Sequence, residues 1–468
     1  MKVLIATSLL GIFAMISELI GLKKWISTIT IVGLLGILAL NVYDWNTTQV
    51  FYGMMRQDSF SAVFSSLLLT ISLLWFILSR DYYSNEENGN VSDQAALILF
   101  ATAGGLILVS FTNLTMLFLG IEIMSIPMYI LAGSHKKDLA SNESSLKYFL
   151  MGAFATGLLL FGIALLYGAT GSFDIIEIRM ALMDVLSNPK TFFLTFVGIG
   201  FILLGFGFKV SAAPLHFWTP DVYEGAPTMI SAFMATFIKT AAFIAFFRLF
   251  VSCFMSMANI WVLQLLFMTA FTILLGNILA VRQTNLKRTL AYSGIAQAGY
   301  ILLTILIPTH DTLVSLLIYT TAYSIATMVA FTVVYHVQKS KNDYSFEAFR
   351  GLGKQNSGLA VVLSIAMLSL AGIPPTFGFF AKFFLFKSIL AVNPMLTIWI
   401  VLFAIVGSLI SLYYYFKVIK SMFGEEAETS TKIELGIGVK LSLYTITSLL
   451  IILGLAPSLF LEFAALLK

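Results

Sequence analysis

The stretch KVSAAPLHFWTPD, residues 209–221, places two prolines at the end of a long apolar run. Proline has no amide donor and breaks the hydrogen-bond ladder of a helix. The apolar run begins near residue 191 and is long enough for a membrane helix, which needs about 20 apolar residues. A break at membrane depth is tolerated only where protein or water satisfies the freed backbone groups. The stretch therefore predicts a broken helix inside a membrane bundle.

A second stretch, AGIPPTFGFFAK at residues 371–382, repeats this device five predicted helices later. Lys209 precedes the prolines of the first stretch, whereas Lys382 follows the prolines of the second. Because the order differs, the two stretches do not establish a sequence repeat. Broken helices in corresponding halves of a chain are typical of ion pathways in transporters. An ordinary proline kink is the alternative at either position.

The composition of the whole chain also indicates a membrane protein. Of its 468 residues, 59% are apolar and 11% are charged, against about 25% charged residues in a soluble domain. This balance excludes a soluble enzyme and a disordered chain. Cys253 is the one cysteine, which excludes a disulfide framework and a thiolate cluster. The formal net charge of +4 is too small to indicate a nucleic-acid partner.

Apolar runs of about 20 residues recur along the chain, as transmembrane helices require. We therefore expect an all-α, polytopic membrane protein with about fourteen spans in a single transmembrane domain, residues 1–468. The run after Lys2 resembles a signal peptide, but no small-residue cleavage site follows it, so we expect it to remain as the first helix. The predicted spans are 3–21, 25–42, 60–79, 94–112, 114–132, 146–168, 191–216, 226–250, 257–281, 289–307, 312–337, 358–391, 396–420 and 437–466.

Lysine and arginine residues of the predicted loops set the orientation. Sixteen basic residues, among them Lys287, lie in the odd-numbered loops and their flanks. Six, among them Arg248, lie on the opposite side. The odd-numbered loops are therefore predicted to be cytoplasmic, and both termini to face away from the cytoplasm. The six tryptophans fall near predicted span ends, which predicts an interfacial belt.

Four charged residues lie deep inside predicted spans, where each costs about 2.5–3.5 kcal/mol on insertion scales. They are Glu122, Lys209, Lys239 and Lys382. Buried ion pairs stabilise proteins poorly, so a functional role is favoured over a structural salt bridge for these four residues.

Two further lysines lie closer to span ends. Lys147 follows Glu143 by four residues, so an ion pair on one helix face or snorkelling to the interface competes with a functional role. Lys387 is expected to snorkel.

The residue types in the spans indicate proton transfer. Desolvation disfavours the charged form of a buried lysine, and a nearby carboxylate favours it. A movable Glu–Lys contact can therefore switch a lysine between holding and releasing a proton, and several such lysines in series form a relay. The four histidines, His135, His216, His310 and His336, are too scattered to indicate haem or metal ligation. We expect no cofactor, metal or redox centre in this chain.

Residues 209–228, KVSAAPLHFWTPDVYEGAPT, closely resemble the signature of the antiporter-like subunits of respiratory complex I, in the form found in its subunit N branch. The stretches LAYSGIAQAGY at 290–300 and AGIPPTFGFFAK at 371–382 also fit this family, and the resemblance covers nearly the whole chain. Subunits L and M and the Mrp antiporters usually carry a histidine near the position equivalent to Lys239. Residues 231–239 contain none, which favours the subunit N branch.

This resemblance implies a relay, residue by residue. Glu122 matches the glutamate of the fifth helix, and Lys209 matches the lysine of the seventh helix that pairs with it. Lys239 matches the lysine of the eighth helix, and Lys382 that of the twelfth helix near the outward exit. Lys147 matches a further lysine on the sixth helix. Quinone reduction elsewhere in the complex would drive proton movement through these groups.

The resemblance also implies an architecture, partners and a location. Two inverted five-helix repeats, about 94–250 and 257–420, would each contain a broken helix, the seventh and the twelfth. Subunit M and the small subunits K and J would be neighbours in the lipid bilayer of a bacterial cell (inner) membrane. FMN, iron–sulfur clusters and quinone would belong to other subunits. The alternatives are an Mrp-type cation/proton antiporter subunit and a structural assembly module.

Overall fold

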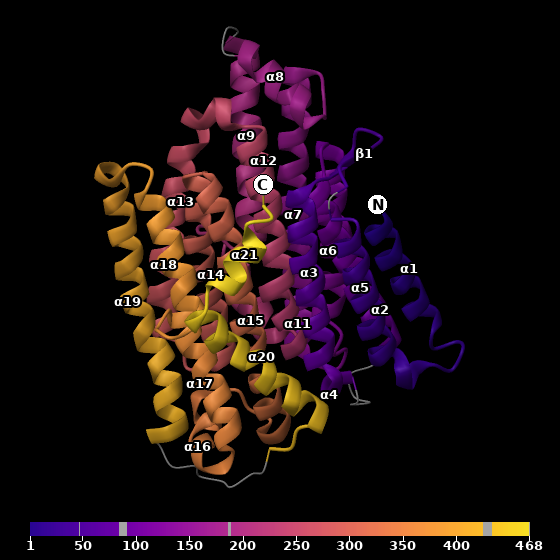
Figure 1. Ribbon diagram of the computed structural model, residues 1–468, viewed down its shortest axis with the longest axis vertical. Helices are drawn as coiled ribbons and strands as arrows, with labels where there is room; N and C mark the ends of the chain where they lie inside the picture. Colours follow the sequence, from indigo (N-terminus) through magenta and orange to yellow (C-terminus); the bar gives the residue numbers. More distant parts are fainter. Residues whose placement is uncertain (46, 84–90, 186–188, 425–432, 468) are drawn as a thin grey trace.

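The computed structural model describes residues 1–45, 47–83, 91–185, 189–424 and 433–467. These residues are almost entirely helical, as predicted (Figure 1), with a small antiparallel hairpin of β1 (Gln49–Phe51) and β2 (Met55–Gln57). The helices up to the middle of the chain are α1 (Lys2–Ile16), α2 (Ile26–Tyr43), α3 (Ser59–Leu78), α4 (Arg80–Tyr83), α5 (Val91–Ser110), α6 (Leu114–Ala132), α7 (Leu139–Thr170), α8 (Ile175–Val185), α9 (Pro189–Lys209), α10 (Trp218–Gly225), α11 (Thr228–Phe233) and α12 (Lys239–Ser252). The remaining helices are α13 (Ala258–Val281), α14 (Leu286–Leu306), α15 (His310–Lys341), α16 (Leu352–Gln355), α17 (Ser357–Ala371), α18 (Phe377–Leu390), α19 (Pro394–Gly424), α20 (Ile437–Leu455) and α21 (Ser458–Ala464).

Twelve helices within the described residues are long and apolar enough to cross a membrane. They match twelve of the predicted spans in order. The other two predicted spans, 3–21 and 358–391, correspond to the 15-residue helix α1 and to the pair α17 and α18. The all-α membrane fold is therefore confirmed, whereas the predicted number of fourteen includes one short helix and one helix in two halves.

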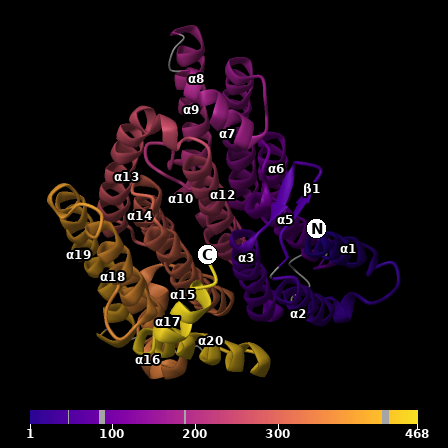
Figure 2. The same cartoon turned by 45° about the horizontal axis from the view of Figure 1, so that its top comes forward.

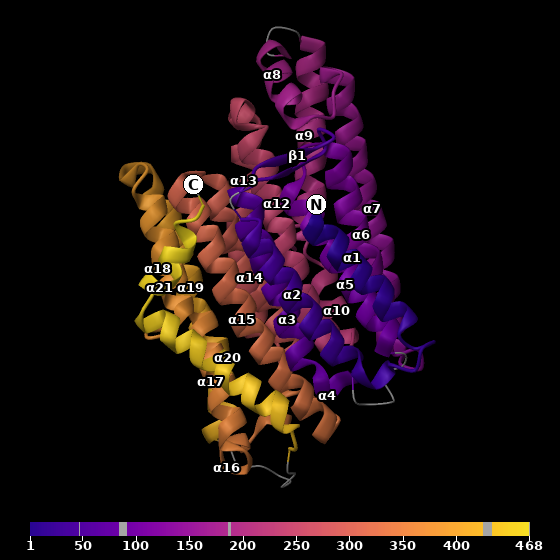
Figure 3. The ribbon, with the colours of Figure 1, turned by 45° about the vertical axis from the view of Figure 1, so that its right-hand side comes forward.

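The centre of the bundle consists of α11, α12, α14 and α15. The most hydrophobic part of Thr228–Ser252 is buried in its entirety, and 94% of the corresponding parts of α14 and α15 are buried, against 28% for α20. Figure 2 shows α3, α5 and α6 on one side of this centre and α13, α18 and α19 on the other. In Figure 3 most of the long helices run in roughly the same direction, while α20 crosses them at an angle. Lys239 at the start of α12 thus lies in the interior of the bundle.

The first predicted break lies between α9 and α10. α9 ends at Lys209, and α10 begins at Trp218. The Ala213 amide donates to Thr272 Oγ1 of α13 at 2.8 Å, and Trp218 Nε1 donates to the Phe208 carbonyl at 3.1 Å. Protein groups thus replace intrahelical hydrogen bonds, as a break at membrane depth requires.

The second predicted break lies between α17 and α18. α17 ends at Ala371, and Gly372 takes a left-handed conformation with φ of 82° that stops the helix. α18 begins at Phe377, and the Gly378 amide donates to Ser369 Oγ of α17 at 3.2 Å. A Cβ at residue 378 would clash with the carbonyl of Ser369. The two half-helices therefore pack together through a position that requires glycine.

The predicted span 226–250 contains an irregularity that the sequence did not indicate. A π-helical turn, Met234–Ile238, joins α11 to α12 directly before Lys239. π-helical turns inside α-helices often occur at functional sites. Here the turn ends at a lysine in the centre of the bundle.

The predicted tryptophan belt is only partly correct. Trp25 and Trp399 are 62% and 73% exposed, as an interfacial position requires, but Trp75, Trp218 and Trp261 are buried. The indole N–H groups of the buried three donate to the carbonyls of Met229, Phe208 and Phe254, respectively. The protein thus supplies the hydrogen bonds that an interface would otherwise provide.

Candidate functional site: buried lysines beside the broken helices

Lys209 lies at the end of α9, where the first break begins. Its residue is 4% exposed, and its Nζ donates to Ser125 Oγ at 2.7 Å and to the Tyr129 hydroxyl at 3.2 Å, both on α6. The same Nζ lies 5.5 Å from the centre of the Tyr129 ring. The partners of this ammonium are therefore hydroxyl groups and an aromatic face.

Glu122 does not form the predicted ion pair with Lys209. No Glu122–Lys209 contact within 4.0 Å is present between these two described residues, and Glu122 Oε1 is buried without a hydrogen-bond partner. Ser125 follows Glu122 by three residues, so both lie on one face of α6. The physical reason is that hydroxyls one turn (Ser125) and two turns (Tyr129) further along α6 bind the ammonium. Glu122 and Lys209 are thus linked here only through α6, which carries Glu122 and both hydroxyl partners of Lys209.

Lys239 lies at the start of α12 and is 1% exposed. Its Nζ donates to the carbonyl of Gly294 on α14 at 2.9 Å and lies 5.9 Å from the centre of the Tyr223 ring. A Cβ on residue 294 would lie 3.4 Å from this Nζ and 3.0 Å from the Tyr323 hydroxyl. A Cβ at residue 294 would thus be tight against the Tyr323 hydroxyl and in ordinary contact with the ammonium.

Lys382 lies on α18, just after the second break, and is 6% exposed. Its Nζ donates to the carbonyl of Ala371 at 2.9 Å and to Ser408 Oγ at 2.9 Å, and it lies 4.9 Å from the centre of the Tyr300 ring. Ala371 is the last residue of α17, where carbonyls lack intrahelical partners and carry partial negative charge. The break thus creates the acceptor that holds the lysine.

Polar side chains link the surroundings of Lys239 and Lys382. Gln297, one turn after Gly294 on α14, donates to the Leu370 carbonyl at 2.8 Å and to the Tyr415 hydroxyl at 3.2 Å, and it accepts from Tyr319 at 2.5 Å. A small cavity touches Gln297, Tyr319 and Lys382. None of these linking residues was predicted. The one signal in the sequence is that Gln297 lies within the stretch 290–300, which fits the family.

Lys147 lies in a different environment from the other predicted relay residues. Its Nζ pairs with Glu143 at 2.7 Å, which confirms the expected i,i+4 pair, and with Asp221 of α10 at 2.9 Å. Its side chain is 33% exposed. Arg288 of α14 also binds Asp221, at 2.9 Å. The structure therefore groups Lys147 with an ion-pair network and not with the three buried lysines.

We expect Lys147→Gln to lower proton pumping by no more than about twofold. The pairs that it removes are partly exposed, where an ion pair contributes about 1 kcal/mol or less, and Arg288 continues to hold Asp221. Pumping by membrane vesicles, normalised to assembled complex, measures the effect. Lys147→Arg, which keeps the charge, is the matched control. A tenfold loss in both variants would contradict this expectation and show that Lys147 carries protons, because arginine does not release its proton at neutral pH.

Two residues counted as loop charges are buried. Lys287 is 2% exposed, and its Nζ donates to the Ala226 carbonyl at 2.8 Å. Arg248 is 8% exposed and binds Asp58 Oδ2 at 3.3 Å. It also donates to the carbonyls of Val109 and Phe111 at the end of α5. Lys387, in contrast, is exposed as predicted.

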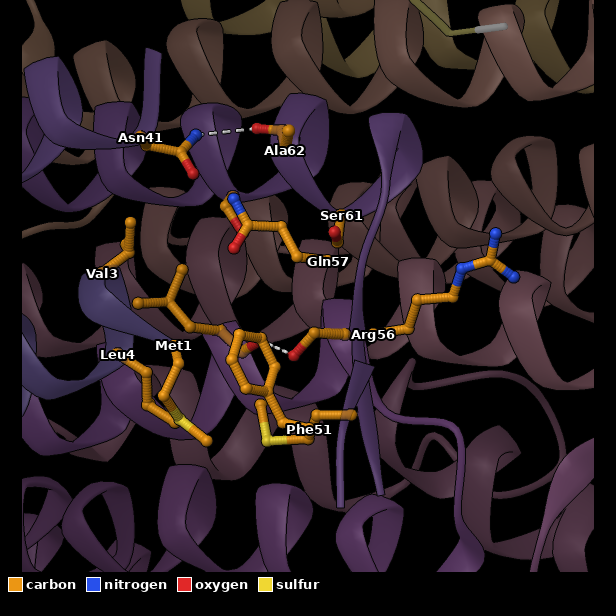
Figure 4. A pocket seen from close by; sticks show the side chains of 13 residues that line it. Met1, Val3, Leu4, Asn41, Phe51, Arg56, Gln57, Ser61 and Ala62 are labelled. Carbon is orange, nitrogen blue, oxygen red and sulfur yellow. Dashed lines mark hydrogen bonds between the residues drawn. The ribbon is translucent and has the colours of Figure 1, made fainter. Parts of the chain in front are cut away.

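Other polar features lie apart from this series. A pocket beside the β-hairpin is lined by residues of α1, α2, α3 and α5, and Asn41 there donates to the Ala62 carbonyl at 2.9 Å (Figure 4). None of the three buried lysines lines it. Among the described residues, no three His, Cys, Asp or Glu side chains are grouped so that they could hold a metal ion.

Comparison with known proteins identifies the family. The family model described as NADH:quinone oxidoreductase/Mrp antiporter, TM, matches residues 112–411. A protein from Cytophaga hutchinsonii, named NADH-quinone oxidoreductase subunit N, is 50% identical over 464 residues, which are 99% of each chain. The chain belongs to the NADH-quinone oxidoreductase subunit N family. The subunit N of Flavobacterium psychrophilum is 40% identical over 99% of this chain and 100% of its own.

Solved structures agree with membership of the subunit N family. A chain of respiratory complex I from Thermus thermophilus with bound aureothin has a TM-score of 0.83 and 31% identity, and the match covers 98% of each chain. A chain of the Mrp complex from Dietzia sp. has a TM-score of 0.85 over 100% of this chain and 97% of its own, but is 19% identical. The Mrp likeness therefore shows a common fold, while the sequence identities favour subunit N over the Mrp alternative.

Proposed function

We propose that this chain is the proton-translocating membrane subunit N of NADH-quinone oxidoreductase. In this proposal Glu122, Lys209, Lys239 and Lys382 carry the protons. The observation that supports it is that each of the three buried lysines binds only hydroxyl or carbonyl oxygens, with no carboxylate within 4.0 Å among the described residues. A lysine with neutral partners can accept or lose a proton without breaking an ion pair.

The proposed route runs from α6 towards α18. Glu122 and Lys209 exchange a proton when their side chains come into contact, and the proton then moves to Lys239. From Lys239 it passes along α14 by way of Gln297 and its hydroxyl partners to Lys382. Small polar cavities can hold bridging water where side chains do not touch. In this proposal Lys147 lies at the edge of the route, where it binds Asp221 of α10.

The energy for this movement is proposed to come from other subunits. FMN, iron–sulfur clusters and quinone would be bound there, and quinone reduction would change the charge next to this chain. Subunit M and the small subunits K and J are the proposed neighbours. A change of charge beside Glu122 would act on Lys209 through a medium of low dielectric, where electrostatic interactions are strong. The chain's own residues then only hold and move protons.

The proposed setting is the inner membrane of a bacterial cell. The loop charges support cytoplasmic odd-numbered loops and two outward termini, because they outnumber those of the other side by sixteen to six. Burial of Lys287 and Arg248 removes one charge from each side and leaves the bias unchanged. Within one transmembrane domain, we propose two inverted repeats, about 94–250 and 257–420. Each range contains one broken helix beside a buried lysine.

Proton movement should depend on quinone reduction. We expect the lumen of proteoliposomes that contain the assembled complex to acidify when NADH and quinone are supplied. An inhibitor of quinone reduction should stop this acidification. A sodium gradient without NADH is the matched condition. Proton movement driven by that gradient alone, at the rate seen with NADH, would instead indicate an Mrp-type antiporter. The electron donor and the quinone are varied in the same assay.

A further inference from the structure

We propose that α10 is a bracket that sets the positions of Lys209 and Lys239, and that Asp221 and Arg288 are positioning residues because they anchor it. This inference rests on the proposed function. It goes beyond that function because it assigns a role to an ion-pair network that carries no proton itself. α10 lies directly after the first break and has only eight residues. Isolated helices need about 12–15 residues to be stable in water, so the position of α10 depends on its contacts.

Ion pairs fasten α10 to two helices from different halves of the chain. Asp221 accepts from Lys147 of α7 and from Arg288 of α14, each at 2.9 Å. Glu224 accepts from the same Arg288 at 2.7 Å and from Asn285 at 2.8 Å. All four carboxylate oxygens on α10 are therefore used. The two acidic residues hold α10 between α7 and α14.

The charge of Asp221 is held firmly by this network. Partial burial alone would raise the pKa of its carboxyl group, but the hydrogen bonds from Lys147 and Arg288 lower that pKa below its usual value. Asp221 therefore stays ionised at neutral pH. A permanently ionised carboxylate is suited to anchoring and unsuited to relaying protons.

The first residue of α10 is connected to Lys209. Trp218 donates from Nε1 to the carbonyl of Phe208, the residue before Lys209, at 3.1 Å, and its ring stacks on Phe208 at 5.1 Å. On the other side Trp218 stacks on Tyr148 at 4.7 Å, and Tyr148 meets Tyr129 edge-on at 4.8 Å. The Tyr129 hydroxyl is a partner of Lys209. A shift of α10 would therefore move both the backbone and a partner of Lys209.

A later residue of α10 is connected to Lys239. The ring of Tyr223 lies 5.9 Å from Lys239 Nζ, and it also contacts Trp218 at 6.1 Å. The Tyr223 carbonyl accepts from Ser231 Oγ of α11 at 2.7 Å. One short helix thus contacts the surroundings of both lysines. Its anchors determine how the two lysines lie relative to each other.

The test uses Asp221→Asn and Asp221→Glu in the complete complex. We expect Asp221→Asn to assemble, to exchange the backbone amides of residues 218–225 with deuterium at least about tenfold faster, and to pump several-fold fewer protons per NADH oxidised. Asp221→Glu should restore much of the pumping because it keeps the charge. The double variant Asp221→Asn/Arg288→Gln should pump no fewer protons per NADH than the single variant that pumps less, because the effects of coupled residues are not additive. Glu347→Gln is the matched control, because it removes an ion-paired carboxylate whose side chain is 74% exposed.

Each outcome separates this inference from the proposed function. Normal pumping in Asp221→Asn despite faster amide exchange would overturn the bracket. Lost pumping with unchanged exchange would also overturn it, because Asp221 would then act by another route. If Asp221→Asn does not assemble, Glu224→Gln is used in its place. We expect it to show the same faster amide exchange and lower pumping, with smaller changes. Lys239→Met is measured beside them: normal pumping there rejects the proposed function, whereas normal pumping in Asp221→Asn alone rejects only the bracket.

Discussion

Lys239→Met should lower proton pumping by at least about tenfold while the complex remains assembled. A tenfold change corresponds to about 1.4 kcal/mol in the barrier. Methionine fills the space of the lysine stem but cannot bind a proton, so the step through residue 239 is lost. Folding should tolerate the change, because replacing a buried charged group by an apolar one of similar size is often neutral or stabilising. Within the described residues, the backbone carbonyl of Gly294 is the one hydrogen-bond acceptor of the Lys239 ammonium.

Pumping is measured as acidification per NADH oxidised, and assembly by the amount of intact complex in the membrane. Lys387→Met is the matched control, because Lys387 is on α18 with an exposed side chain. Full pumping by Lys239→Met would rule out the relay. Loss of the assembled complex, with normal pumping by what remains, would favour a structural assembly module instead.

The positions of the deep lysines and of both breaks were predictable from the sequence because their signals are local. A lysine such as Lys239 inside an apolar run is visible without knowledge of the fold, since its cost in the membrane depends on its own neighbours along the chain. The breaks before Trp218 and after Ala371 were visible because proline and glycine act on the backbone where they stand.

The partners of those lysines were not predictable, because they come from other helices. Ser125, Gln297 and Ser408 are ordinary residues of apolar helices, and only packing brings them to an ammonium. The choice of a hydroxyl and not Glu122 as the partner of Lys209 depends on which group of α6 faces the end of α9. A difference of one turn along α6 decides whether Lys209 meets the carboxylate of Glu122 or the hydroxyl of Ser125.

Errors in the loop assignment have a similar cause. Lys287 stands next to Arg288 in a polar run, and the pair looks like the start of a helix at the membrane surface. The structure separates them: Arg288 binds carboxylates on α10, whereas Lys287 turns inward to the Ala226 carbonyl. The two neighbouring residues thus point to different faces of α14. This difference becomes visible only when α10 is placed against α14.

Gly378→Ala should disrupt the second break and prevent most of the chain from folding into the complex. The added Cβ would clash with the backbone carbonyl of Ser369, so α17 and α18 would have to separate. Overpacking of this kind costs about 1–3 kcal/mol or more, and a backbone atom cannot move aside as a side chain does. Separation would also draw the Ala371 carbonyl away from Lys382. The amount of assembled complex and its thermal stability measure the effect.

Gly157→Ala is the matched control for this substitution. Gly157 lies inside α7, and a Cβ there would meet nothing within 4 Å. Alanine is favoured over glycine in a helix by about 1 kcal/mol, so the control should be as stable as the parent or slightly more so. The contrast isolates close packing of the half-helices from the general effect of adding a methyl group. Normal assembly and normal pumping by Gly378→Ala would mean that the half-helices can separate freely, and the carbonyl of Ala371 would then not be needed to hold Lys382.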